Sequence, residues 1–193
     1  DYTKLAAAQR AIGNFVNIVT GKQIPVKFQN NDESYTDGKS VTIGSKIEDK
    51  NFDPAVGLAL HEGSHIAFTN FKLLDGCYIG SSFHNYIAMR GGDPDMDMRE
   101  DDIMKVKDLF NWVEDRRIDY HVYTNAPGYR KYYESMYAKY FHSKIVDKAL
   151  RSDEKTDEDW DSYMFRIINL TNTNRRLDVL EVLPKVWKLI DLK

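Results

Sequence analysis

The sequence of 193 residues has only one cysteine, Cys77, so no disulfide can form within the chain. A lone cysteine favours a reducing compartment or a particle assembled inside the cell. The chain also lacks any apolar run near the roughly 18 residues that a membrane-spanning helix needs, and no signal-peptide segment opens it. We therefore expect no membrane partner and a cytoplasmic or virion-associated location.

An excess of charge of one sign is also missing, because the sequence has 27 Lys and Arg residues and 30 Asp and Glu residues. This balance lacks the basic footprint of a nucleic-acid-binding protein, so we expect no nucleic-acid partner. The content of hydrophobic residues, 42%, excludes a disordered chain. Because the chain starts at Asp1 and stops at Lys193 without a tail, we expect a single domain over 1–193 that is a fragment of a longer chain.

The apolar pattern predicts a mainly helical α+β domain with a small N-terminal β-sheet. Two β-like runs, 24–29 and 41–47, flank a segment rich in turn residues and predict an antiparallel hairpin or meander. Segment 71–102 has several glycines and no period, and we expect a long loop or lid there. The predicted helices span 5–19, 54–70, 101–123, 129–150, 160–170 and 177–192.

An H-E-x-x-H motif, His61 to His65, lies in the middle of the predicted helix 54–70, which is apolar around most of its circumference. Residues four apart share one helical face, so both imidazoles can converge on one metal ion. Glu62 points beside them and can take a proton from a water molecule as general base. Two neutral imidazoles with a carboxylate suit zinc with one coordination position open. The structural alternative, two surface histidines and a surface glutamate, conflicts with these apolar surroundings.

Zinc requires a third protein ligand, and no further histidine follows the motif in residues 66–71. The predicted helix 101–123 offers the adjacent acids Glu114 and Asp115. We expect Glu114 to be the ligand, because it has the longer side chain and follows the apolar stripe that is expected to face the core. This stripe consists of Ile103, Val106, Phe110 and Val113. Asp115 would then hold a ligand imidazole by a hydrogen bond. Two alternatives stay open: Asp115 is the ligand, or the Glu-Asp-Arg-Arg stretch is a solvated face with local ion pairs.

Three features together carry a resemblance to a known family: the H-E-x-x-H helix, the stretch Thr36–Lys39 before it, and the pattern of Asn111, Glu114, Asp115, Arg117 and Ile118. They resemble zincin metallopeptidases of the gluzincin type. More narrowly, they are similar to phage and bacterial peptidases associated with von Willebrand factor A domains, and cobaltochelatase-subunit-like proteins share the pattern. The resemblance covers roughly residues 24–141. It implies a zincin-like domain with a central active-site helix, and a strand at 41–47 that forms the edge of the cleft and pairs with an extended substrate.

The residues and the resemblance together predict a zinc-dependent endopeptidase. A water molecule activated by one Zn²⁺ ion, with Glu62 as general base, would hydrolyse a peptide bond of a polypeptide substrate. The resemblance also implies a partner domain of the von Willebrand factor A type in the same chain. The alternatives are a non-catalytic zincin-fold module that binds peptides, or a structural component of a phage assembly. The presence of Glu62 argues against the binding module, since such a module does not need a general base.

Two further side chains are candidates to stabilise the oxyanion of the tetrahedral intermediate. His121 lies seven residues after Glu114 and therefore on the same face of the predicted helix. Tyr129 follows shortly after and could donate a hydrogen bond from its hydroxyl group. For each of these residues, packing in the core is the alternative role.

Overall fold

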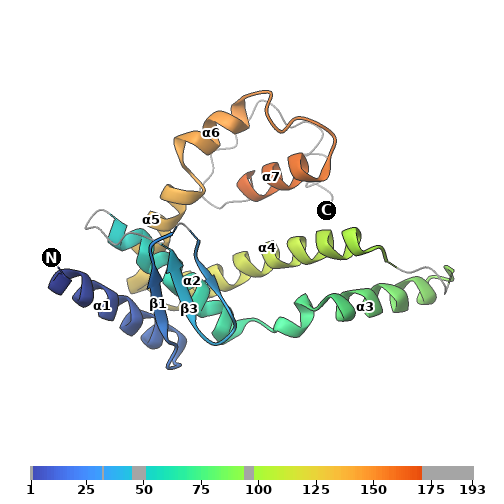
Figure 1. Cartoon of the computed structure of the whole chain (residues 1–193). Helices are drawn as coiled ribbons and strands as arrows, with labels where there is room; N and C mark the ends of the chain where they lie inside the picture. Colours follow the sequence, from blue (N-terminus) through green and yellow to red (C-terminus); the bar gives the residue numbers. More distant parts are fainter. Residues whose placement is uncertain (1, 32, 45–50, 94–97, 171–193) are drawn as a thin grey trace. The chain divides into compact units, whose positions relative to one another are not determined.

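The computed structural model describes four stretches of the chain: residues 2–31, 33–44, 51–93 and 98–170 (Figure 1). Its contacts divide the chain into two compact units, residues 1–133 and residues 134–193, where the sequence led us to expect one domain. The boundary falls within a helix, so no linker of distinct composition marks it in the sequence. The predicted helix 177–192 lies outside the described residues.

In chain order, the helices and strands are α1 (Tyr2–Thr20), β1 (Val26–Gln29), β2 (Tyr35–Thr36), β3 (Val41–Gly44), α2 (Phe52–Phe68), the 3-10 turn η2 (Phe71–Leu74), α3 (Gly76–Met89), α4 (Glu100–Asn125), the 3-10 turn η3 (Pro127–Tyr129), α5 (Arg130–Tyr140), α6 (Lys144–Arg151) and α7 (Trp160–Leu170). This mainly helical α+β architecture with one small sheet confirms the predicted fold class. Among the described helices, none combines the length and the apolar character that crossing a membrane requires.

The small sheet has the strand order β1-β3-β2 (Figure 1). The pair β1 and β3 is parallel, with Val26 opposite Val41, so the predicted antiparallel pairing of these two runs is wrong. The chain between them is long enough to reverse direction twice, and β2 pairs antiparallel with β3 on its other side. In the described residues β3 is thus the central strand of the sheet, which corrects the expectation that it forms the edge for an extended substrate.

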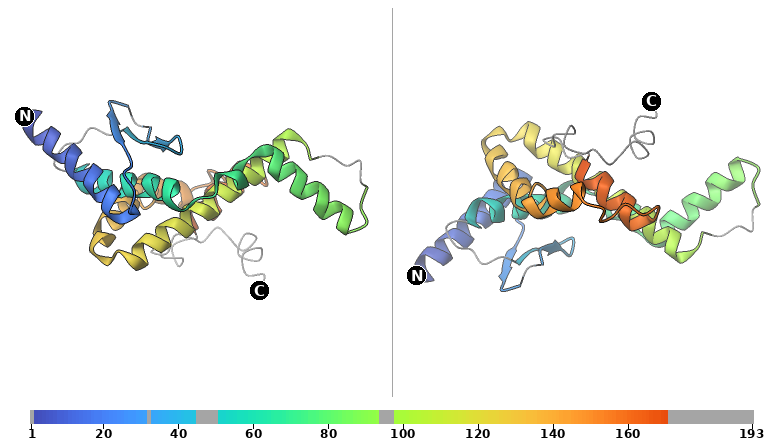
Figure 2. Two further views of the ribbon diagram at one scale, coloured as in Figure 1. Left: turned by 90° about the horizontal axis from the view of Figure 1, so that it is seen from below. Right: turned by 90° about the horizontal axis from the view of Figure 1, so that it is seen from above.

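Helix α2 contacts both α1 and α4 within the first unit (Figures 1 and 2). Gly63, inside the H-E-x-x-H motif, faces α1, and a Cβ atom added there would lie only 2.6 Å from Val16 Cγ1. The absence of a side chain at Gly63 therefore lets the two helices approach closely. Because His61 lies about 200° from Gly63 around the helix, the close contact with α1 leaves the histidine face free for α4.

Helix α3 lies against the first half of α4, so the prediction of a long loop over 71–102 is wrong for residues 71–89 (Figure 2). Gly76 and Gly80 suggested a loop, but both lie within α3, on its side next to Ile103 of α4. Asp75 begins the helix, since its carboxylate accepts hydrogen bonds from the backbone N–H groups of Cys77 and Tyr78.

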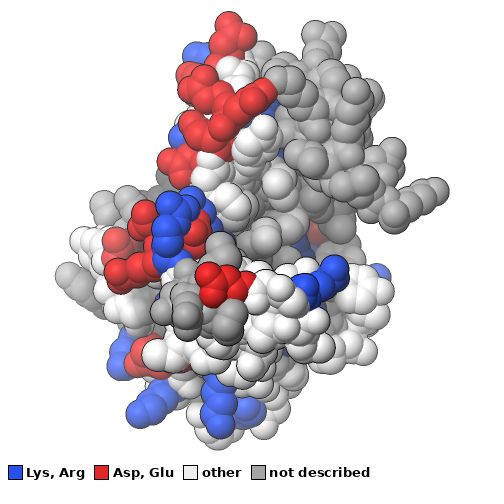
Figure 3. All heavy atoms as spheres, turned by 90° about the vertical axis from the view of Figure 1, so that its right-hand side faces the viewer, with Lys and Arg blue, Asp and Glu red and all other residues white. Residues whose placement is uncertain are grey.

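The second unit contains α6 and α7 joined by a connector. The predicted helix 129–150 is divided there, because Ser143 caps a new helix by accepting a hydrogen bond from Val146 N–H. The guanidinium group of Arg166 donates to the carbonyl oxygens of Leu150, Glu154 and Lys155, which holds the connector to α7. Acidic side chains gather on one part of the face drawn in Figure 3, and those exposed in this connector and at the start of α7 are Asp153, Glu154, Asp157, Glu158, Asp159 and Asp161.

Candidate metal centre

The two motif histidines of α2 meet an aspartate of α4. His61, His65 and Asp115 each offer one ligand atom, and these three atoms lie within 4.8 Å of one another. Asp115 Oδ1 lies 3.1 Å from His65 Nε2 and 3.8 Å from His61 Nε2. The imidazole rings are nearly perpendicular, with centroids 4.9 Å apart, so both Nε2 atoms turn toward the same carboxylate.

In the structure Asp115, and not Glu114, lies beside the two motif histidines. Adjacent residues of a helix point about 100° apart, so only one of the two acids can face α2 in this way. Glu114 instead accepts two hydrogen bonds of 2.6 Å from Arg117, one turn further along α4. This contact with Arg117 lowers the pKa of Glu114 despite partial burial. The shorter side chain of Asp115 suffices because α2 and α4 pack directly against each other.

The surroundings of Asp115 fit a cation. Its Oδ1 atom is buried and accepts no hydrogen bond from any described residue, although two imidazole nitrogens lie close by. A buried carboxylate oxygen without a partner is costly. Ligand atoms at zinc distances of about 2.0–2.1 Å would be about 3.3–3.4 Å apart in a tetrahedral site. The observed 3.1 Å and 3.8 Å bracket that separation, so the three residues could hold a metal ion.

His61 is held by an aspartate that the sequence analysis did not single out. Asp119 is buried on α4. Its Oδ1 atom lies 2.8 Å from His61 Nδ1, and its Oδ2 atom lies 3.6 Å from Arg116 Nη2. A carboxylate can only accept, so Nδ1–H donates and Nε2 is left to face Asp115. Burial would lower the pKa of His61, but the negative charges of Asp119, Asp115 and Glu62 outweigh it and raise this pKa to about 9.

The spacing of Asp119 from Asp115 is the one sequence signal that points to it. Asp115 and Asp119 are four residues apart and share one face of α4, as His61 and His65 share one face of α2. Two helices that meet through two such pairs bring four side chains together. Asp119 lies one turn beyond Asp115, outside the Glu-Asp-Arg-Arg stretch that the sequence indicated.

Glu62 is half-buried in the same turn of α2 as the histidines. Burial raises the pKa of its carboxyl group, while the nearby imidazoles of His61 and His65 oppose this increase. A carboxylate with a raised pKa accepts a proton more readily near neutral pH, which suits a general base.

The two oxyanion candidates have other contacts. The ring of His121 packs on Phe68 with centroids 4.6 Å apart, and Asn125 donates a hydrogen bond to its backbone carbonyl. Tyr129 packs against Phe15 of α1, with ring centroids 5.6 Å apart. Among the contacts of the described residues, none joins either side chain to the His61, His65 and Asp115 cluster, so their expected role stays a prediction.

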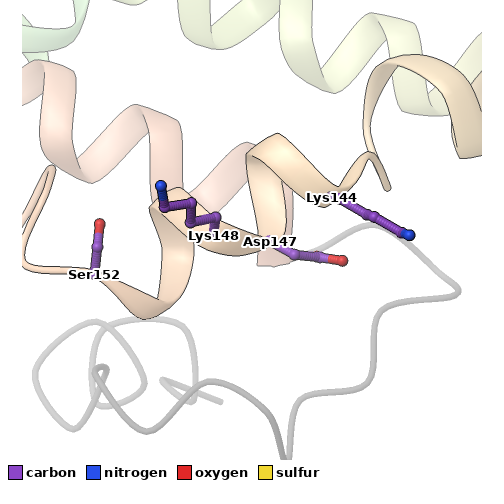
Figure 4. Close-up of a pocket in the computed structure, with 4 residues that line it drawn as sticks. All are labelled: Lys144, Asp147, Lys148 and Ser152. Atoms are coloured by element: carbon purple, nitrogen blue, oxygen red, sulfur yellow. The ribbon is translucent and has the colours of Figure 1, made fainter.

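A hollow in the second unit offers no comparable arrangement. Lys144, Asp147, Lys148 and Ser152 line it, all from α6 or the residue after it (Figure 4). The two lysine side chains point apart in this view, so they do not converge on one position. The metal cluster on α2 and α4 is therefore the stronger candidate for a functional site.

Comparison of this chain with protein-family models, with curated proteins and with solved structures finds no match. The resemblance to zincin peptidases thus stays a prediction from the sequence, and function is argued from the geometry of the cluster.

Proposed function

We propose that this protein is a zinc-dependent endopeptidase in which His61, His65 and Asp115 hold one zinc ion. The observation that carries the proposal is the buried Oδ1 atom of Asp115, which accepts no hydrogen bond from the described residues and lies beside two imidazole Nε2 atoms. Three protein ligands leave one position open in a tetrahedral site, as in catalytic zinc centres. The polypeptide substrate, and a von Willebrand factor A domain as partner, are supported by the resemblance alone.

When bound, zinc would polarise the carbonyl group of the scissile peptide bond and lower the pKa of a water molecule. Glu62 then acts as the base: its carboxylate accepts a proton from the attacking water. The water oxygen bonds to the carbonyl carbon, the bond between carbon and nitrogen breaks, and Glu62 passes its proton to the leaving amine. The raised pKa of Glu62 favours the first transfer, and the return of the proton restores the carboxylate.

The decisive experiment combines metal analysis with proteolysis of a denatured generic protein. The wild-type protein, prepared without chelator, is expected to carry about one zinc per chain and to cleave the substrate. Glu62→Gln should keep its zinc and lose turnover by about 100-fold or more, because loss of a general base typically costs 10²–10⁴-fold. Glu100→Gln, at the exposed start of α4, is the matched control and should match the wild type.

The outcomes separate the competing functions. Zinc binding without cleavage of any substrate would favour a peptide-binding or structural module over a peptidase. Unchanged turnover in Glu62→Gln would end the assignment of Glu62 as base. A protein that neither contains nor takes up zinc would contradict the proposal altogether.

A further inference from the structure

Two cationic side chains bind carbonyl groups at the C-terminal end of α2. Lys22 Nζ lies 3.1 Å from the carbonyl oxygen of Ile66 and 3.4 Å from that of Ala67. Arg117 Nη2 donates to the carbonyl oxygen of Phe68 at 2.7 Å. The last carbonyl groups of a helix lack partners within it, and the helix dipole favours cations there. Capping of α2 explains the contacts of Lys22 and Arg117 equally well.

The two cations differ in the element that carries them. Lys22 follows α1, whereas Arg117 lies on α4, two residues after Asp115. The last turn of α2 is therefore attached to α4 at two points. His65 Nε2 lies 3.1 Å from Asp115 Oδ1, and three residues later the carbonyl oxygen of Phe68 accepts from Arg117. Because Asp115 and Arg117 point about 200° apart around α4, the two contacts together restrict the rotation of this helix about its own axis.

Glu114 holds the guanidinium group of Arg117 in the orientation that the contact with α2 needs. Arg117 Nε and Nη2 each lie 2.6 Å from one carboxylate oxygen of Glu114, in the two-pronged geometry that orients both groups. Nη2 carries two protons, so it can donate one to Glu114 and the other to the carbonyl oxygen of Phe68. Arginine only donates and both acceptors only accept, so the direction of every hydrogen bond is determined.

The stability of an exposed ion pair does not by itself account for this arrangement. The side chain of Arg117 is 52% exposed, and exposed pairs contribute little to the free energy of unfolding. The rotation of α4, in contrast, decides which acid faces the motif histidines, since Glu114 and Asp115 point about 100° apart. With Glu114 bound to Arg117, and Arg117 bound to the end of α2, the carboxylate beside the histidines is that of Asp115.

We propose that Arg117 is a positioning residue, which ties the end of α2 to α4 and thereby holds His65 and Asp115 at the separation that a metal ion needs. This inference rests on the proposed function, because zinc is the ion assigned to that pair. A second contact from α4 reaches the same end of α2. His121, one turn after Arg117, packs its ring on that of Phe68 with centroids 4.6 Å apart.

The test compares two variants that each remove one cation from the end of α2. Arg117→Met removes the contact with α4, and Lys22→Met is the matched control, because Lys22 lies outside α4. We expect Arg117→Met to weaken zinc binding about tenfold, the lower end of the effect of residues behind a ligand, measured by competition with a chromophoric chelator. Lys22→Met should not weaken zinc binding. The visible absorption spectrum of the cobalt(II)-substituted protein, which reports ligand geometry, should shift in Arg117→Met alone.

The sign of the effect separates positioning from simple electrostatics. If charge alone mattered, removing a positive charge near the site would strengthen the binding of Zn²⁺. Wild-type or tighter zinc binding in Arg117→Met, with an unchanged cobalt spectrum, would overturn the inference. Equal weakening in Arg117→Met and Lys22→Met would show that capping of α2 is what matters, which also overturns it. Because Arg117 is half-exposed, the variant should fold, and the thermal midpoint of the metal-free protein checks this.

A third variant tests whether Glu114 acts through Arg117. Glu114→Gln weakens the two-pronged contact, so it should shift the cobalt spectrum in the same direction as Arg117→Met. The double variant should lose little more zinc affinity than Arg117→Met alone. Losses in zinc affinity that simply add would contradict the role given to Glu114.

These results are distinguishable from a failure of the proposed function. If the wild-type protein binds zinc but cleaves no substrate, the endopeptidase proposal fails, while weaker zinc binding in Arg117→Met still supports the positioning role. If the wild type binds zinc and cleaves, and Arg117→Met matches it in zinc affinity and cobalt spectrum, the positioning role alone is wrong. A wild-type protein that binds no zinc contradicts both.

Discussion

The two halves of α4, taken as residues 100–113 and 114–125, differ in the side chains that they bury. In the first half, the apolar side chains of Phe110 and Val113 are 46% and 52% exposed. In the second half, the charged residue Asp119 is only 5% exposed, and Asp115 has a buried carboxylate oxygen. Apolar residues left in solvent are common, whereas buried charge without compensation is costly. The buried acids therefore tell more about function than the exposed apolar residues do.

Compensation explains how the second half of α4 tolerates its charges. Asp119 contacts an imidazole and Arg116, and Glu114 contacts Arg117, so two of the three acids have cationic or hydrogen-bonding partners. Asp115 faces two imidazole nitrogens, and its Oδ1 atom accepts no hydrogen bond within the described chain. The comparison of the two halves thus leads to a single oxygen atom, where a metal ion would supply the missing interaction.

The largest effect is expected on zinc affinity, when one aspartate in each half of α4 is replaced and the two variants are compared. Asp115→Ala should weaken zinc binding by more than about 100-fold, which exceeds the usual effect of losing a residue behind a ligand. Asp108→Ala, at an exposed position in the first half, should leave zinc affinity unchanged. Competition with a chromophoric chelator measures both. If Asp115→Ala keeps its zinc and Glu114→Ala loses it, the ligand expected from the sequence is restored and the structural assignment falls.

A smaller effect is expected on the number of protons that the protein releases when zinc binds. With a pKa of about 9, His61 in the metal-free protein is protonated at pH 7.5 and must lose a proton to bind zinc. Because zinc competes with this proton, affinity should rise with pH up to about pH 9. Asp119→Asn keeps an acceptor for Nδ1–H but removes the charge that raises the pKa, so fewer protons should be released.

Isothermal titration in buffers of different ionisation enthalpy counts these protons. The wild-type binding enthalpy should depend on the buffer with a slope of about one proton from His61, and Asp119→Asn should show a weaker dependence. Equal slopes for the two proteins would show that Asp119 does not control the protonation of His61. In that case the buried charge of Asp119 would no longer distinguish the second half of α4 from the first.

Much of the fold and two of the three residues of the cluster could be predicted from the sequence. Local signals located α2 and both motif histidines, since periodicity and the i, i+4 spacing are properties of one helix. The partner acid could not be chosen in the same way. Whether Glu114 or Asp115 faces α2 depends on the rotation of α4 about its own axis, which packing sets and periodicity did not reveal.

The same rotation explains the error in the apolar stripe. Ile103, Val106, Phe110 and Val113 repeat at helical spacing and predicted the buried face of α4. The residues that are buried on α4 are instead Ile118, Asp119 and Val122, one of them charged. Polar residues at core positions break the pattern that sequence analysis depends on, and such breaks are expected at functional sites.

The smallest effect is expected when Val113 is replaced. This substitution tests whether the apolar side chains in the first half of α4 are exposed. Val113→Gln exchanges a half-exposed apolar residue for a polar one with a slightly better helix propensity. Its free energy of unfolding should change by less than about 0.5 kcal/mol, as for most surface substitutions. Ile118→Ala, five residues further and fully buried, should lose about 2–5 kcal/mol in the same urea titration.

The ratio of the two losses in free energy of unfolding distinguishes two descriptions of α4. In one, the apolar stripe predicted from the sequence faces the core, and in the other, this stripe is exposed. If the apolar stripe predicted from the sequence faced the core, burying a glutamine there would cost well above 1 kcal/mol, because its amide would lack partners. A loss of that size in Val113→Gln would mean that the first half of α4 is covered in solution. In that case the exposure of its apolar side chains, and with it the contrast with the buried acids, would need another explanation.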